Sequence, residues 1–352
     1  MLAEVNLLSE FFMFLIWVAG MVVFVFIVAI VYITIEAKGG KKGVPDDALD
    51  YEYKSDILPE DGYYIDLHSH TLASDGWMTP EQNIRWHIAN GFDAFVLTDH
   101  NTGKNNKPTL ELQEKYPEIL IIPGYEWTAM NIHLNFIGIE DYPYKVPSNA
   151  SDDDVKTAIA RAKDLGAVVM VDHITWTKDQ PRLRSGDLVH PTREDLLEWG
   201  ADGFEINNEM YWHDPKTIAL HERWGGEWRD RKIFLGTGTD IHNPLTSWVT
   251  GWTQLFLDEK DKRKVSIEMV KQALLDGKTK TWQDYDYHKP NEERWMHGSK
   301  GNTLKTIFAP FIGVVKGAEY VFTNNKIITS YVIWLMIAYL PIRLLFWIFN
   351  LL

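Results

Sequence analysis

Between Tyr63 and Thr281 the chain alternates short apolar stretches with amphipathic helical ones. Such alternation is typical of parallel strands joined by helices that cover the outside of the sheet. A chain of 352 residues fits one barrel domain with additional segments as well as it fits two domains. The alternation therefore predicts an α/β fold with parallel strands and outer helices. The apolar stretches include residues 63–65, 92–98, 119–122, 132–139, 167–171, 203–206 and 232–235.

Helix start signals fall where the alternation requires them. In Thr79–Gln82, Thr is an N-cap residue, Pro occupies the first helical position and Gln can complete a capping box. Ser151 is followed by three Asp residues, which suit the positive end of a helix dipole. The expected apolar stripe of this second helix is Val155, Ile159, Ala162 and Leu165.

The expected strands end in residues that bind divalent metals. In a parallel α/β barrel the carboxyl ends of the strands gather at one mouth, where active sites are built. The chain has no Cys, so any metal must be held by His, Asp and Glu. The candidate ligands are His68, His70, Asp75, His100, Glu126, His133, His173, Asp240 and His242.

His68 and His70 alone are weak evidence for a metal site, and the complete set of candidate ligands is stronger evidence. Residues two apart on a strand project from the same face, so these imidazoles can begin a divalent metal site. An isolated H-x-H pair is more often a pair of surface or core histidines. The succession of such residues at consecutive strand ends favours the metal site.

These residues lie in motifs that resemble the PHP family, the polymerase and histidinol phosphatase domains. The motifs are DLHSHTLASDG, GFDAFVLTDHN, PGYEWTA with IHLNFIGI, VVMVDH and LGTGTDIH, in the order of the family. The resemblance implies a distorted, TIM-like (βα)7 barrel with a site for up to three divalent ions. Nitrogen and oxygen ligands are compatible with zinc, manganese or iron.

The resemblance also implies how the ligands are shared among the ions. One ion would be held by His68, His70, Glu126 and Asp240. Glu126 would bridge to a second ion, held also by His133 and His173. The third ion would be held by Asp75, His100 and His242. Two positions depart from the family pattern without removing a ligand: Ile174 replaces a common Pro, and Thr239 replaces a more usual Ser.

Clustered divalent ions convert a bridging water to hydroxide near neutral pH and clamp the oxygens of a phosphoryl group. The resemblance therefore implies a metal-dependent phosphoesterase in which a metal-bridging hydroxide attacks a phosphate ester. We expect Glu126, Asp240 and His242 to be the catalytic residues and a phosphorylated small molecule to be the substrate.

Other polar residues at strand ends have several interpretations. Asp66, Asp99 and Asp172 adjoin candidate ligands and are expected either to orient imidazoles or to be ordinary solvated or capping residues. Glu205 and Asn207 end another strand. They are expected to form a hydrogen-bonded bridge or to contact substrate.

The loop of residues 174–191 is long for a connection between a strand and a helix. Its Arg182 and Arg184 are candidates for binding the substrate phosphate through paired hydrogen bonds. The alternative is a solvated basic loop, which is the usual place for charged residues.

Apolar segments near both ends predict attachment to a cell membrane. Residues 11–35 are uncharged and long enough to span a bilayer, and three lysines follow them. The basic side stays in the cytoplasm, which places the barrel there. A cleaved signal peptide would be shorter and preceded by basic residues. Residues 327–352 contain Pro341 and Arg343, so they are expected to span with a kink, to lie at the interface, or to be a buried core helix.

The sequence thus predicts five regions. They are an N-terminal transmembrane helix (residues 1–36), a linker (37–62), the metal-dependent hydrolase domain (63–285), a connector with an interfacial helix (286–326) and a membrane-embedded helix (327–352).

The net charge of the chain excludes some classes of binding partner. With 49 acidic and 35 basic residues, the net charge of −14 argues against a broad surface for nucleic acid or anionic lipid, because both need a positive field. Membrane lipid and partner subunits of a membrane complex remain as expected partners. The alternative function is therefore an accessory or scaffold subunit that retains a metal-binding barrel, and a nuclease is a more distant one.

Overall fold

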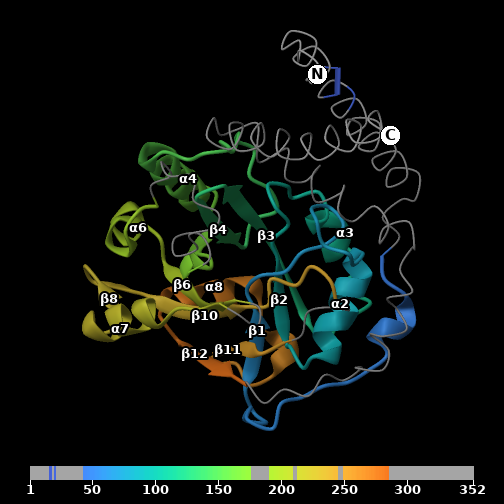
Figure 1. Cartoon of the computed structure of the whole chain (residues 1–352). Helices are drawn as coiled ribbons and strands as arrows, with labels where there is room; N and C mark the ends of the chain where they lie inside the picture. Colours follow the sequence, from blue (N-terminus) through green and yellow to red (C-terminus); the bar gives the residue numbers. More distant parts are fainter. Residues whose placement is uncertain are drawn as a thin grey trace, which may run out of the picture. The chain divides into compact units, whose positions relative to one another are not determined.

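The computed structural model of the chain describes residues 16–17, 20, 43–175, 190–208, 212–244 and 249–284. Almost all of these belong to one compact unit, Lys42–Gly298, which is shown in Figure 1. Arg182 and Arg184, the predicted C-terminal membrane segment and nearly all of the N-terminal one lie outside the described residues. Among the residues described, no helix is both long and apolar enough to cross a bilayer.

The unit is built from short strands and the helices between them. The helices are η1 (Asp46–Leu49), α2 (Pro80–Ala89), α3 (Asn106–Leu110), α4 (Asp152–Asp164), α6 (Arg193–Trp199), α7 (Pro215–Arg223), η2 (Lys262–Lys264) and α8 (Ile267–Leu275). The strands are β1 (Tyr63–Asp66), β2 (Ala94–Leu97), β3 (Leu120–Ala129), β4 (Ile132–Ile137), β5 (Val168–Val171), β6 (Gly203–Asn208), β7 (Trp212–His213), β8 (Glu227–Trp228), β9 (Arg231–Lys232), β10 (Phe234–Gly238), β11 (Gly251–Leu255) and β12 (Thr279–Gln283).

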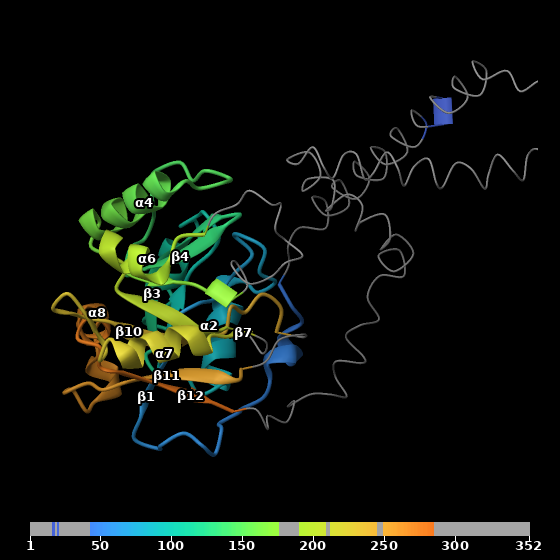
Figure 2. The same cartoon turned by 60° about the vertical axis from the view of Figure 1, so that its left-hand side comes forward.

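Nine of these strands form a sheet in the order β10-β6-β5-β4-β3-β2-β1-β11-β12, with β7 paired to β6 at the side. The two ends of the sheet meet through hydrogen bonds. Thr237 N–H of β10 donates to Thr253 Oγ1 of β11 (2.8 Å), and Thr279 Oγ1 of β12 donates to the Leu235 carbonyl of β10 (3.0 Å). The sheet is therefore a nearly closed barrel, with its helices on the outside (Figures 1 and 2).

The sequence predicts a barrel of seven parallel strands, and this part of the prediction is wrong. The barrel has nine strands, and the pairs β1–β11, β3–β4, β4–β5 and β11–β12 are antiparallel. Only Met130 and Asn131 connect β3 to β4, and so short a connection can join only antiparallel strands. Apolar patterns report burial rather than strand direction, so the sequence alternation could not show this.

The predicted helix starts are confirmed. Thr79 Oγ1 accepts from the Gln82 N–H, and Gln82 Oε1 accepts from the Thr79 N–H, both at 3.2 Å. Ser151 and Asp154 form the same reciprocal pair at the start of α4. The predicted burial of Leu165 is wrong, because this residue is the C-cap of α4 and its side chain is 42% exposed.

The barrel interior is apolar at one end only. Ile65, Leu67 and Met170 fill it together with the first residues of β1, β2 and β5. Val270 and Leu274 of α8 belong to the same cluster. Helix α8 therefore closes the end at which the parallel strands begin, and the opposite end remains for polar groups.

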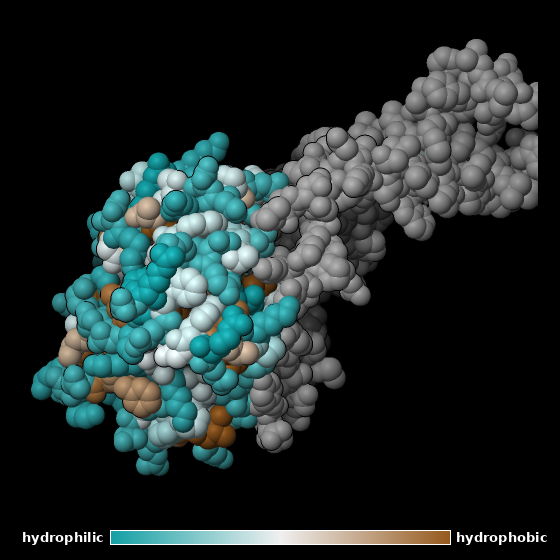
Figure 3. All heavy atoms as spheres, turned by 90° about the vertical axis from the view of Figure 1, so that its left-hand side faces the viewer, coloured by the Kyte–Doolittle hydropathy of each residue, from teal (hydrophilic) through white to brown (hydrophobic). Residues whose placement is uncertain are grey.

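The outer surface is mainly hydrophilic on the face that carries α6 and α7. Figure 3 shows this face, where apolar residues form small separate spots on a polar background. Scattered apolar residues are normal on a protein surface, whereas a large contiguous patch would indicate an interface. The visible part of this face offers no such patch.

Candidate metal centre

The candidate ligands come together at one end of the barrel, although they are far apart in sequence. Strand β4 is antiparallel, so its early residue His133 lies opposite Thr128 near the end of β3. The remaining ligands reach this end from β3 or from the segments that follow β1, β2, β5 and β10. They are His68, His70, Asp75, His100, Glu126, His173, Asp240 and His242.

Four buried polar atoms meet at the centre of this group. His70 Nε2 lies 2.7 Å from Asp240 Oδ1, and His68 Nε2 lies 3.3 Å from the same oxygen. Both nitrogens are 3.5 Å from Glu126 Oε2. None of these four atoms has a hydrogen-bond partner among the described residues. Unpaired buried polar atoms are costly, and a divalent cation would satisfy all four together. The residues therefore fit a metal ion.

Glu126 reaches further ligands with both of its oxygens. Its Oε1 lies 2.6 Å from His133 Nδ1 and 3.8 Å from His173 Nε2, and its Oε2 contacts His100 Nδ1. A carboxylate shared in this way can bridge two ions. The closest ligand atoms combine His133 with His100, and His173 with His68, around Glu126. The resemblance instead implies that His133 and His173 share one ion.

The outer ligands are more accessible than the inner ones. Asp75 Oδ1 lies 3.1 Å from His242 Nε2 and 3.5 Å from His100 Nε2. The Asp75 side chain is 60% exposed, and the His100 and His242 side chains are 24% and 27% exposed. His70 stacks beneath them, with ring centroids 4.2 Å from His242 and 4.4 Å from His100. Solvent therefore reaches the centre from the side of Asp75.

The buried imidazoles differ in their pKa. Burial alone would lower the pKa of His68, but the charges of Asp240, Glu205 and Glu126 raise it well above its ordinary value. Burial lowers the pKa of His70 to about 3, with a further contribution from the charge of His242. Burial also lowers the pKa of His133 to about 4. Both rings are neutral at pH 7, which is the form that binds metals. Burial alone would raise the pKa of Asp240, but the surrounding imidazoles hold it well below its ordinary value.

Two of the ligands depend on unusual backbone conformations. Asp240 has a φ of 48° and His173 a φ of 22°, both in the left-handed region. Non-glycine residues rarely adopt this region, and those that do cluster at functional sites. Both residues lie two positions after the end of a strand, where this backbone conformation changes the direction of the chain.

Asp66 links the two strands that supply the inner ligands. Its Oδ1 accepts from the backbone N–H groups of His68 (3.2 Å) and Thr239 (2.9 Å). Its Oδ2 lies 2.9 Å from Nε2 of the buried His87. Asp66 therefore contacts an imidazole, as one interpretation of the sequence predicted, but the imidazole belongs to a residue that is not a candidate ligand. Its main effect is to hold the end of β1 against the segment before Asp240.

Comparison with solved structures identifies the fold. A two-domain protein from Bacteroides vulgatus, which contains a predicted PHP-like metal-dependent phosphoesterase, matches with a TM-score of 0.50. The match covers 67% of this chain and 69% of that chain, at 23% sequence identity. The chain has the PHP-like fold. Its buried His, Glu and Asp clusters lie at the end of the PHP-like barrel opposite α8.

Two curated relatives match shorter parts of the chain. The 5′-3′ exoribonuclease Rnm of Escherichia coli is 34% identical over 80 residues, which are 21% of this chain and 27% of that protein. An uncharacterized protein of Methanocaldococcus jannaschii is 28% identical over 117 residues, which are 31% of this chain and 44% of that protein. The chain thus spans less than half the length of either relative. No family model matches the chain.

Asp99 and Asp172 have different environments in the PHP-like barrel. Asp99 accepts from Thr71 N–H and from Ser74 Oγ, both at 2.7 Å, so it fixes the loop after β1 rather than an imidazole. Both carboxylate oxygens of Asp172 are buried without a hydrogen-bond partner among the described residues. One of them lies with an atom of His68 and an atom of Glu205 in one group of potential ligand atoms. Sequence reasoning did not identify this group.

Glu205 and Asn207 are both buried in β6. Glu205 Oε1 lies 3.1 Å from His68 Nδ1, so the structure shows the hydrogen-bonded bridge that the sequence left open as one of two roles. Asn207 Oδ1 accepts from Gln283 Nε2 (2.6 Å) and joins β6 to β12. The signal in the sequence was the polar run at the end of an otherwise apolar strand.

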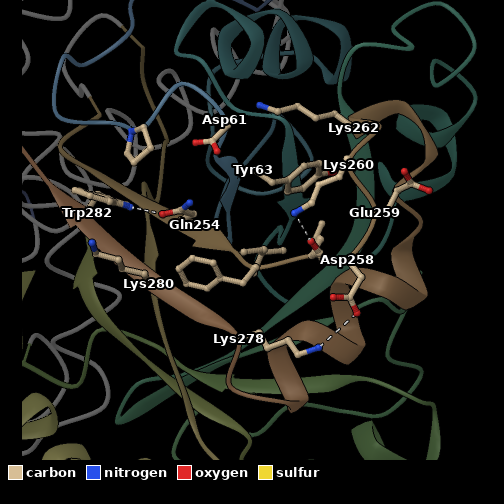
Figure 4. A pocket seen from close by; sticks show the side chains of 14 residues that line it. Asp61, Tyr63, Gln254, Asp258, Glu259, Lys260, Lys262, Lys278, Lys280 and Trp282 are labelled. Carbon is tan, nitrogen blue, oxygen red and sulfur yellow. Dashed lines mark hydrogen bonds and ion pairs between the residues drawn. The ribbon is translucent and has the colours of Figure 1, made fainter.

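A groove at the other end of the barrel has a different chemistry (Figure 4). It has a volume of about 700 Å³ and none of its lining residues is a histidine. Lys262 lies 2.9 Å from Asp93, and Lys278 lies 3.6 Å from Asp276 and 3.9 Å from Asp258. Its residues are Pro59, Asp61, Tyr63, Gln254, Leu255, Phe256, Leu257, Asp258, Glu259, Lys260, Lys262, Lys278, Lys280 and Trp282.

Proposed function

We propose that this chain is a metal-dependent phosphoesterase that hydrolyses a phosphate ester. The observation that carries the proposal is the meeting of four unpartnered buried atoms, from His68, His70, Glu126 and Asp240, at one end of the barrel. A group of imidazoles and carboxylates suits borderline divalent ions such as zinc, manganese or iron. The PHP-like fold supports the same proposal.

The geometry assigns separate tasks to the residues. Divalent ions at this site would activate a water molecule and neutralise phosphate oxygens. Glu126 and Asp240 would hold the ions, because each carboxylate lies within reach of several imidazoles. The exposed side chain of Asp75 marks the side from which a phosphate ester would approach His242.

The substrate class is best tested with two kinds of ester. The acidic balance of the chain favours a phosphorylated small molecule over long nucleic acids. The name of the Escherichia coli relative, a 5′-3′ exoribonuclease, makes a short RNA with a 5′-phosphate the appropriate second probe.

The experiment uses the full chain purified in mild detergent. Its metal content would be measured by elemental analysis, and hydrolysis of both kinds of ester would be assayed before and after treatment with EDTA. We expect bound divalent metal, release of phosphate from the small-molecule ester or of nucleotides from the RNA, loss of activity after chelation and recovery on adding Mn²⁺ or Zn²⁺. Metal-loaded protein that hydrolyses neither kind of ester would contradict the proposal and favour the scaffold function.

We further propose that the protein is held at a cell membrane with the barrel in the cytoplasm. The apolar segments of residues 11–35 and 327–352, and the lysines beside them, support this. The test is fractionation of cells that express the full chain or a variant lacking residues 1–36. Recovery of the full chain in the soluble fraction, without detergent, would contradict membrane attachment.

A further inference from the structure

Behind the candidate metal centre, Glu205 contacts a single imidazole. Its Oε1 lies 3.1 Å from His68 Nδ1, and both side chains are fully buried. The other ring nitrogen, His68 Nε2, is one of the four unpartnered atoms at the centre. Glu205 therefore lies on the side of the ring that faces away from the metal position.

The position of Glu205 is fixed by two further donors. Its Oε2 accepts from the His173 backbone N–H (2.9 Å) and from Asn208 Nδ2 (3.0 Å). Gly238 passes directly beside this pair, and any side chain there would overlap both Glu205 Oε1 and His68 Cβ. The barrel thus reserves space for this contact.

The hydrogen-bond inventory decides where the imidazole proton lies. A carboxylate only accepts hydrogen bonds, so His68 Nδ1 must carry the proton when it bonds to Oε1. The proton on Nδ1 leaves the lone pair on Nε2, which points toward Glu126 and Asp240. Carboxylates that bind the far nitrogen of a ligand histidine in this way fix its tautomer and raise its basicity.

We propose that Glu205 is a positioning residue that holds His68 in the tautomer able to bind a divalent ion. This inference rests on the proposed function for its purpose, but it concerns metal affinity and not hydrolysis. Replacing the carboxylate by an amide should reverse the tautomer. The amide oxygen would remain with the His173 backbone N–H, because that group can only donate. The amide NH₂ would then face His68 Nδ1 and move the imidazole proton to Nε2, where the metal must bind.

The test compares Glu205→Gln with the wild type and with Asp202→Asn. Asp202 is the control because it is another buried carboxylate that accepts a backbone N–H, from Val169. It immediately precedes β6, at the end of the barrel where the parallel strands begin, and it also pairs with Lys163 and Arg231. Mn²⁺ would be titrated into metal-free protein and followed by paramagnetic resonance. We expect Glu205→Gln to weaken the affinity for at least one ion by about 10- to 100-fold. Asp202→Asn should change it less than about twofold.

Two measurements separate this role from a general structural one. Nitrogen NMR of histidine-labelled, metal-free protein, recorded at a pH above the raised pKa of His68 so that its ring is neutral, should show one ring changing from the Nδ1–H to the Nε2–H tautomer in Glu205→Gln. Asn208→Ala keeps the carboxylate and removes one donor, so it should weaken Mn²⁺ binding in the same direction by less than about tenfold. If folded Glu205→Gln binds Mn²⁺ with unchanged affinity, the inference is wrong. A wild type that binds Mn²⁺ tightly but hydrolyses no ester would contradict the proposed function alone.

Discussion

The two ends of the barrel both carry many charged side chains, but they use them differently. At the end opposite α8, buried atoms of His68, His70, Glu126 and Asp240 meet without hydrogen-bond partners among the described residues. In the groove at the other end, lysines lie near carboxylates and remain in contact with solvent, as Lys278 does beside Asp276.

This difference shows which charges are arranged for a ligand. Solvent-exposed ion pairs contribute little and are common on surfaces without any function. Buried polar atoms are almost always satisfied in folded proteins. Two unsatisfied imidazole nitrogens that lie 2.7 to 3.5 Å from two unsatisfied carboxylate oxygens therefore require an explanation. A bound cation provides it. Convergence together with missing partners, rather than charge density, identifies the functional end.

The largest effect is expected from Glu126→Gln. Its carboxylate touches imidazoles from several strands, so the neutral amide should prevent binding of at least one ion and lower hydrolysis by about a thousandfold or more. Initial rates at saturating Mn²⁺ and elemental analysis of the same sample would measure both effects. The control is Asp202→Asn, which should retain metal and activity.

A folded Glu126→Gln protein with full metal content would contradict the claim that the end opposite α8 binds metal through this carboxylate. The carboxylate would then be a structural group like those in the groove. Circular dichroism of the metal-free variant checks that any loss of activity does not come from unfolding.

The second largest effect is expected on the free energy of unfolding, from the buried ion pair between Asp214 and Arg193. Asp214 caps α7 by accepting from the Thr217 N–H (3.0 Å), and its Oδ2 lies 2.5 Å from Arg193 Nη2. Asp214→Ala would leave the guanidinium buried without its partner and should lower the free energy of unfolding by about 3 kcal/mol. Asp214→Asn keeps a capping oxygen and should cost less. Urea unfolding of metal-free protein would measure both variants.

The acid dependence of this effect has a definite sign. Burial alone would raise the pKa of Asp214, but hydrogen bonds from Thr217 and Arg193 and the charge of Arg193 lower it below the ordinary value of 3.8. A lowered pKa in the folded state stabilises the protein above the pKa of the unfolded state, and this contribution is lost as the pH falls through the folded value. The difference between wild type and Asp214→Asn should be constant from pH 7 to about pH 5 and shrink below pH 4. A constant difference down to pH 3 would contradict the assignment.

The sequence was sufficient for local structure and for the list of candidate ligands. The capping box at Thr79 depends on residues three positions apart, and the ligands depend only on lying at strand ends. The apolar pattern did not predict the direction of β4. This strand is antiparallel to β3 because only a short turn after Ala129 connects the two. The sequence likewise did not predict the way the ligands group around Glu126.

The polar layer behind the ligands shows a second limit. Glu205 and Gly238 are 33 positions apart, and neither has a pattern that predicts contact with His68. Asp99 adjoins His100 in sequence but bonds to the loop at Thr71 instead. Neighbourhood in sequence was therefore a poor guide to which carboxylate orients which imidazole. Such contacts depend on register between strands that are distant along the chain.

The smallest effect is expected in the groove. Lys280 lies 3.7 Å above the Trp282 ring, and Lys278 is near two exposed carboxylates. An exposed cation–π contact contributes about 0.5–1 kcal/mol, and exposed ion pairs contribute about as much or less. The double substitution Lys278→Ala and Lys280→Ala should therefore shift the unfolding free energy by about 2 kcal/mol at most. It should change hydrolysis less than about twofold, because no candidate ligand lies there. Steady-state kinetics and urea unfolding of the double variant measure both quantities. A tenfold rise in KM with an unchanged kcat would mean that the groove binds part of the substrate, and the functional contrast between the two ends would then no longer hold.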